Sequence, residues 1–124
     1  MELINNKYCI QGIDVKDICN KFGTPLYVYD SDIIHRQVNH FRNAFKQINC
    51  KIKYACKANT NLSILKEMLN HGAGLDTVSV PEIKMGLLVG FKAEEIVFTP
   101  NCVDFSEIEA AVELGVNINI ENLP

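Results

Sequence analysis

Apolar residues recur over the second half of the chain in short runs that alternate with longer amphipathic stretches. The short runs are rich in β-branched and aromatic residues, which favours strands, and they lie roughly twenty residues apart. Their centres are Tyr54, Thr77, Phe98 and Ile118. The stretches between them have the apolar spacing of helices and cover residues 62–70, 81–89 and 105–114. The pattern predicts four strands joined by three helices.

Strands and helices in this alternation predict right-handed βαβ units and therefore a parallel sheet. Four strands with three crossover helices amount to about half of a (β/α)8 barrel. The spacing alone does not distinguish a closed barrel from an open sheet of the flavodoxin type, which is the structural alternative. In both architectures the carboxyl ends of the strands form the edge where active sites lie.

The first 30 residues do not follow this period. Residues 8–13 form a possible short strand, and Asp14 can cap a helix that Gly23 ends. Residues 26–29 have the aromatic and β-branched content of a strand. A longer helix is expected to begin at Asp30 or Ser31, because apolar residues then recur in steps of three and four. Its apolar stripe contains Ile34, Val38, Phe41 and Phe45.

Lys57 is the first candidate for chemistry, since it stands at the end of the first strand of the periodic region. Alternation along that strand places Tyr54 and Cys56 on one face and Ala55 and Lys57 on the other. A desolvated lysine amine can lose its proton and form a Schiff base with an aldehyde. From spacing alone a solvated or ion-paired cation is the more frequent role of a lysine at the end of a strand.

Several motifs carry a resemblance that extends through most of the chain. In chain order, these motifs are GTPLYVYD at 23–30, YACKAN at 54–59, GAGLDTVS at 72–79 followed by Glu82, EIVFTPN at 95–101 and GVNINIEN at 115–122. They resemble segments of the fold-type III pyridoxal-phosphate decarboxylases, most of all those that act on diaminopimelate. The resemblance implies a partial (β/α)8 TIM barrel of the alanine racemase-like type, with pyridoxal 5'-phosphate as cofactor.

The same resemblance implies roles for individual residues. Lys57 would carry pyridoxal 5'-phosphate as a Schiff base and so be both catalytic and cofactor-binding. Asp76 matches an aspartate beside the cofactor, although it could equally be an ion-pair partner of Lys57 or of another cation at a strand end. Glu82 matches an acid near the site, but a capping box with Ser79 accounts for it without chemistry. No metal site is expected.

The activity implied is decarboxylation of meso-2,6-diaminopimelate to L-lysine, with ornithine, arginine or carboxynorspermidine as alternative substrates. A complete barrel needs about 250 residues, whereas the chain has 124. We therefore expect an amino-terminal portion of a longer enzyme, inactive alone and at most an interaction module. Its expected parts are residues 1–30, with a strand of an absent β domain, and residues 31–124, the first half of the barrel.

The composition of the chain limits the kinds of binding partner and the cellular compartment that we expect. The net charge of −3 offers no electrostatic case for nucleic-acid binding. No apolar run is long enough to span a membrane, and the amino terminus lacks the pattern of a secretory signal. Five cysteines without a Cys-x-x-Cys pair favour reduced thiols. We expect a cytoplasmic enzyme with a small amino-acid substrate, which forms a homodimer at full length.

Overall fold

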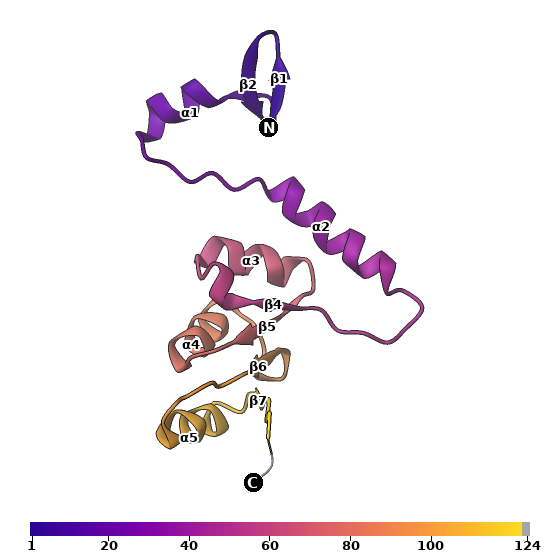
Figure 1. The fold of residues 1–124 in the computed structure, drawn as a ribbon, viewed down its shortest axis with the longest axis vertical. Helices are drawn as coiled ribbons and strands as arrows, with labels where there is room; N and C mark the ends of the chain where they lie inside the picture. Colours follow the sequence, from indigo (N-terminus) through magenta and orange to yellow (C-terminus); the bar gives the residue numbers. More distant parts are fainter. Residues whose placement is uncertain (123–124) are drawn as a thin grey trace. The chain divides into compact units, whose positions relative to one another are not determined.

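The computed structural model describes residues 1–122 of the chain (Figure 1). The chain divides into two compact units, Met1–Arg36 and Gln37–Pro124. Helix α2 (Ser31–Ala44) crosses the boundary between them. It begins where the sequence predicts, because the Asp30 carboxylate accepts hydrogen bonds from the Asp32 and Ile33 amides at 3.0 and 3.3 Å.

The first unit opens with a three-stranded antiparallel sheet of β1 (Glu2–Ile4), β2 (Lys7–Ile10) and β3 (Ile13–Asp14). Two-residue turns connect the strands, and all four turn residues have positive φ. This is the backbone of the tight hairpin turns that match the twist of antiparallel strands. The turn residues are Asn5, Asn6, Gln11 and Gly12. The possible strand predicted over residues 8–13 is therefore a hairpin instead.

Helix α1 (Val15–Phe22) follows with the predicted cap, since the Asp14 carboxylate accepts from the Lys16 amide at 2.9 Å. The structure has no strand over residues 26–29, where the sequence predicts one that pairs with a β domain. A β-strand is defined by its hydrogen-bonded partner, and none of the strands in residues 1–122 pairs with this segment. Its side chains are exposed, and that of Tyr27 is 87% exposed.

The second unit contains the parallel sheet that the period predicts. Its strands lie in chain order, and each pairs in parallel with the next. They are β4 (Lys53–Ala55), β5 (Gly74–Thr77), β6 (Ile96–Phe98) and β7 (Asn117–Ile118). The fourth strand is shorter than the predicted 116–121, although the Asn119 amide still donates to the Phe98 carbonyl at 2.8 Å.

The crossovers contain helices α3 (Leu62–Asn70), α4 (Val80–Val89) and α5 (Phe105–Glu113). Short 3-10 turns η1 (Cys56–Ala58) and η2 (Ala93–Glu95) complete them. Asn61 and Ser79 cap α3 and α4 through their side chains, as predicted. Asp104 stands at the amino-terminal cap of α5 but makes no side-chain hydrogen bond there, so the second predicted capping box is absent.

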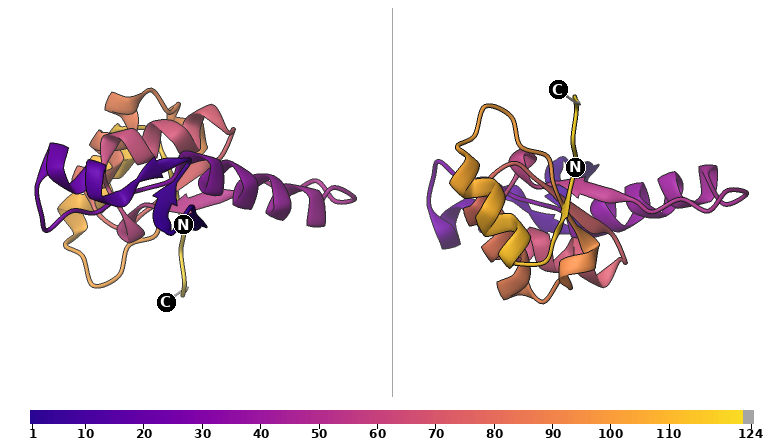
Figure 2. Two further views of the ribbon diagram at one scale, coloured as in Figure 1. Left: turned by 90° about the horizontal axis from the view of Figure 1, so that it is seen from above. Right: turned by 90° about the horizontal axis from the view of Figure 1, so that it is seen from below.

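The helices lie on one face of the sheet, as two further views show (Figure 2). The side chains on that face are fully buried, and they are Leu75, Thr77, Ile96 and Phe98. On the opposite face Ala55, Asp76 and Val97 are only half-buried. An open doubly wound sheet has helices on both faces and does not keep its strands in chain order, whereas a barrel has helices outside only. The fold is a partial (β/α)8 barrel.

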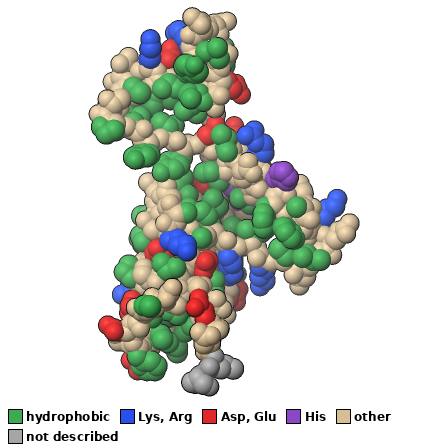
Figure 3. Space-filling view, in the orientation of Figure 1, with side chains coloured by type: hydrophobic (Ala, Val, Ile, Leu, Met, Phe, Trp, Pro, Cys, Tyr) green, Lys and Arg blue, Asp and Glu red, His purple; other side chains and the backbone are tan. Residues whose placement is uncertain are grey.

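Apolar side chains also reach the surface in each unit, and a space-filling view shows one face of the molecule (Figure 3). Tyr27 and Phe22 are examples in the first unit, and Leu88 and Phe105 in the second. Within residues 1–122 no helix combines the length and the apolar character that crossing a membrane requires.

Candidate functional site

Lys57 lies just past the carboxyl end of β4. The strand ends at Ala55, and the chain turns at once into η1, where the Asn59 amide donates to the Cys56 carbonyl at 3.1 Å. The Tyr54 hydroxyl donates to the Asn59 carbonyl at 3.2 Å and fastens the end of this turn to the strand. Lys57 itself is exposed. The structure therefore places an accessible amine at the edge where the sequence predicts it.

Cys56, its neighbour, is turned away from this edge. Its side chain is fully buried. Burial raises the pKa of the thiol to about 11, and the nearby Glu82 carboxylate adds to the effect. A thiol that stays protonated and has no access to solvent is a poor nucleophile. Cys56 is thus a packing residue of the helix-covered face.

Asp76 lies in the middle of the opposite, half-buried face. It is in register with Ala55 of β4 and Val97 of β6. The Thr99 hydroxyl donates to its carboxylate, with 2.6 Å between Thr99 Oγ1 and Asp76 Oδ1. No ion pair joins Asp76 to Lys57 in the part of the chain that the structure describes. Of the two interpretations of Asp76, the ion pair with Lys57 is not formed in these residues, and Asp76 accepts a hydrogen bond from Thr99 instead.

Glu82 serves the start of α4, where it is 8% exposed. Its carboxylate accepts from the Val78 amide at 2.7 Å, and the Ser79 hydroxyl oxygen accepts from the Glu82 amide at 3.4 Å. The Ser79 contact satisfies an amide of the first turn of α4, whereas Val78 precedes the cap residue. The predicted capping box is therefore half formed, because the Glu82 carboxylate accepts from Val78 rather than from the Ser79 amide.

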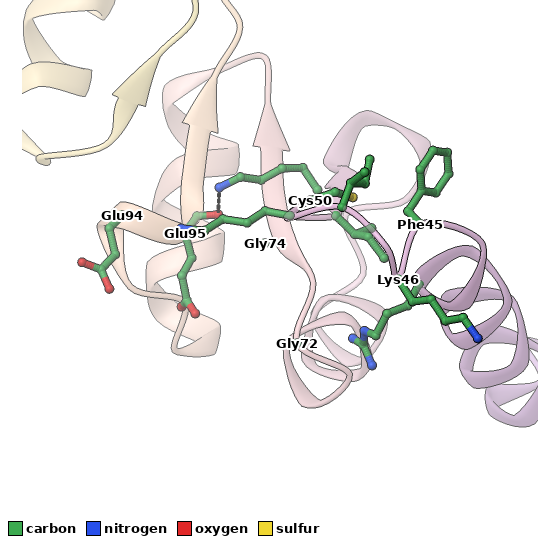
Figure 4. Close-up of a pocket in the computed structure, with 12 residues that line it drawn as sticks. Phe45, Lys46, Cys50, Gly72, Gly74, Glu94 and Glu95 are labelled. Atoms are coloured by element: carbon green, nitrogen blue, oxygen red, sulfur yellow. Dashed lines mark hydrogen bonds between the residues drawn. The ribbon is translucent and has the colours of Figure 1, made fainter.

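Lys53 lies on the half-buried face of the sheet, on the same strand as Ala55, and was not predicted as a site residue. Its amine crosses β5 at Gly74 and donates to the Glu95 carbonyl at 2.7 Å (Figure 4). Desolvation lowers the pKa of Lys53, as does the positive charge of Lys51, while Glu95 and Asp76 oppose the shift. The contact joins β4 to the segment before β6. Sequence could not reveal it, because the partner is a backbone carbonyl 42 residues away.

A cavity of about 710 Å³ opens beside Lys53 at the amino ends of the strands (Figure 4). Its lining mixes basic side chains such as Arg42 and Lys46 with the acidic Glu94 and Glu95. Lys57 and Asp76 do not line it. The cavity is therefore at the edge opposite to the candidate site.

The carboxyl-end arrangement has the chemistry to hold a carbonyl-bearing cofactor. An exposed primary amine can bond to an aldehyde carbon, and a carboxylate on the same face can stabilise positive charge on the nitrogen. Lys57 supplies the amine from η1, just past β4, and Asp76 supplies the carboxylate from the neighbouring strand β5. The residues present therefore fit pyridoxal phosphate at its point of covalent attachment.

Comparison with known proteins identifies the family of the chain. The family described as pyridoxal-dependent decarboxylase, pyridoxal binding domain, matches residues 31–124. The diaminopimelate decarboxylase of Methanothermobacter thermautotrophicus is 36% identical over 115 residues, which make up 91% of this chain and 27% of that protein. The chain thus spans less than a third of the length of this relative.

Solved structures agree with the fold. Diaminopimelate decarboxylase from Methanocaldococcus jannaschii, in complex with L-lysine, superposes with a TM-score of 0.90 at 32% identity. That alignment covers 96% of this chain and 29% of the other. A lysine/ornithine decarboxylase of Vibrio vulnificus in complex with putrescine gives a TM-score of 0.80 at 25% identity, covering 88% of this chain and 30% of that one. The family match includes the whole parallel sheet with Lys57 and Asp76, and the chain belongs to the pyridoxal-dependent decarboxylases, within their pyridoxal binding domain.

Proposed function

We propose that the whole protein decarboxylates meso-2,6-diaminopimelate to L-lysine with pyridoxal 5'-phosphate bound to Lys57. The observation that carries the proposal is the exposed Lys57 amine at the carboxyl end of β4, in a chain of this family. The relatives named diaminopimelate decarboxylase, at 36% and 37% identity, support the choice of substrate.

The residues of this chain would act by binding and orientation. Lys57 would hold the cofactor through its side-chain amine at the carboxyl end of β4. Asp76 faces the same side of the sheet as Ala55, the last residue of β4, and holds negative charge beside that position. When bound, pyridoxal phosphate supplies the electron sink for the pair released as the carboxylate leaves.

Carbon dioxide release tests the substrate assignment. The product of the complete reading frame, loaded with pyridoxal phosphate, is expected to release carbon dioxide from meso-diaminopimelate and to form L-lysine. Ornithine, arginine and carboxynorspermidine serve as competitors at equal concentration. A larger kcat/KM for any of these three would contradict the proposed substrate while leaving the cofactor chemistry intact.

The alternative with specific support is decarboxylation of another basic amino acid. Its support is the fold similarity to the lysine/ornithine decarboxylase of Vibrio vulnificus, at a TM-score of 0.80. Its 25% identity is lower than the 36% of the diaminopimelate relative, and we therefore rank it second.

We propose in addition that the whole protein assembles as a homodimer and is located in the cytoplasm.

Asp76→Asn separates a site role for Asp76 from a structural one. The amide keeps the size of the side chain but removes its negative charge, so pyridoxal phosphate should bind about tenfold more weakly. The melting temperature should change little, because Asp76 is only half-buried. Cofactor titration and thermal unfolding on one sample measure both. Loss of stability with unchanged cofactor affinity would assign Asp76 to the support of the sheet.

A further inference from the structure

The only side-chain hydrogen bond that the structure gives to the Asp76 carboxylate comes from Thr99, as far as residues 1–122 are described. Thr99 follows β6, and its amide donates to the Thr77 carbonyl at 2.8 Å, which extends the sheet by one more residue. The backbone thus fixes the position of Thr99 independently of its side chain. Its hydroxyl is free to serve Asp76.

The strand register shows toward which edge of the sheet Thr99 lies from Asp76. Asp76 lies opposite Val97 of β6. Thr99 is two residues further toward the carboxyl end on the same face, because side chains alternate along a strand. A donor in that place draws the Asp76 oxygen toward the carboxyl edge of the sheet.

Two lysines of the neighbouring chain segment flank the register position of Asp76, one on each side. Ala55 is the register partner of Asp76. Lys53 lies two residues before Ala55, toward the amino edge, and Lys57 lies two residues after it, toward the carboxyl edge. The pKa of Lys53, which desolvation lowers most, is partly restored by Asp76, so this lysine is within reach of the carboxylate's field. Glu95 is the other charged residue acting on Lys53 from the β6 side.

We infer that Thr99 is a positioning residue: its hydroxyl holds the Asp76 carboxylate at the carboxyl edge, so that Asp76 serves Lys57 and its cofactor rather than Lys53. The inference rests on the proposed function and adds a residue to it. Lys53 is already satisfied by the Glu95 carbonyl at 2.7 Å, which leaves Asp76 available to the other edge. Thr99 would thereby control the charge beside the covalently bound nitrogen without touching the cofactor.

Substitutions at Thr99 test the hydroxyl by itself. Thr99→Val keeps the shape of the side chain and removes the hydroxyl donor. Thr99→Ala removes the donor without adding an apolar methyl, and Thr99→Ser keeps the donor. Thr77→Val is the matched control, because the Thr77 hydroxyl also donates within the sheet, to the Val97 carbonyl at 2.9 Å, but is buried on the opposite face.

The readouts are cofactor affinity and the pH at which the visible absorbance of the lysine-bound cofactor titrates. With the donor removed, pyridoxal phosphate should bind about tenfold more weakly, as for loss of one hydrogen bond to a charged group. The absorbance should titrate at lower pH, because the anion that favours the protonated nitrogen has moved away. Thr99→Ser should match the wild type. Thr77→Val should lower the melting temperature and leave both readouts unchanged.

A double-mutant cycle completes the test. In an Asp76→Asn background, Thr99→Val should have no further effect on affinity or on the titration, because the two residues act as one unit. Equal values for Thr99→Val and Thr99→Ser, or an equal shift in Thr77→Val, would overturn the inference and leave the proposed function standing. A wild-type protein that binds no cofactor covalently would overturn both.

Discussion

Replacing Lys57 with alanine should abolish covalent attachment of pyridoxal phosphate and, with it, decarboxylation by the complete protein. The physical reason is that the amine of Lys57 forms the bond to the cofactor. Lys57 is exposed at the end of β4. Cys56, next to it, is fully buried with a pKa raised to about 11. The expected loss is therefore complete rather than partial.

Borohydride reduction followed by peptide mass spectrometry measures the attachment directly. The reduced wild-type protein should carry the phosphopyridoxyl group on the peptide that contains Lys57, and Lys57→Ala should carry none. Lys51→Ala is the matched control, because Lys51 is an exposed lysine shortly before the same strand. Its visible absorbance and activity should equal those of the wild type. A label on a different lysine would show that the cofactor attaches elsewhere.

Gly74→Ala should destabilise the protein by about 3 kcal/mol, the upper part of the range for overpacking a core. A Cβ at this position would lie 2.4 Å from the Glu95 carbonyl oxygen and 2.9 Å from Lys53 Cδ. The carbonyl belongs to the backbone and cannot move aside as a side chain could. Gly74 therefore leaves the space that the Lys53 amine crosses (Figure 4). Denaturant or thermal unfolding of the complete protein measures the loss.

Gly86→Ala is the comparison for this prediction. Gly86 is buried in α4, and a Cβ there would meet the methyl ends of Leu75 and Ile96 at 2.6 and 3.1 Å. These ends can rotate, and alanine also favours a helix by about 1 kcal/mol over glycine. Gly86→Ala should thus cost clearly less than Gly74→Ala. A larger loss of stability in Gly86→Ala than in Gly74→Ala would show that the close approach of the Glu95 carbonyl does not require glycine at position 74.

The sequence predicted the parallel sheet well because the strands and helices repeat with local signals. Apolar runs, helix caps such as Asn61 and glycines after helices are properties of neighbouring residues. Local signals do not decide residues 26–29, whose composition favours a strand but whose pairing depends on other segments. Neither the turn at Asn5 and Asn6, which have positive φ, nor the short β1 before it was predicted.

The candidate site was only partly predictable for a related reason. The place of Lys57 follows from one strand and its end. The partner of Asp76 is Thr99, 23 residues further along, and it emerges only when the register of β5 and β6 is known. A charge-based expectation paired Asp76 with a lysine, whereas the structure pairs it with a hydroxyl. Register, rather than residue type, decided the contact.

The chain order of β4 to β7 has a consequence for biosynthesis. Each strand pairs with the one made about twenty residues earlier, so no strand has to wait for a distant part of the chain. Contacts of short sequence separation form early and quickly. The sheet can therefore lengthen strand by strand while the ribosome is still translating, with each new helix covering the strand that precedes it. Lys57 would be in place on a folded edge before the rest of the polypeptide is synthesised.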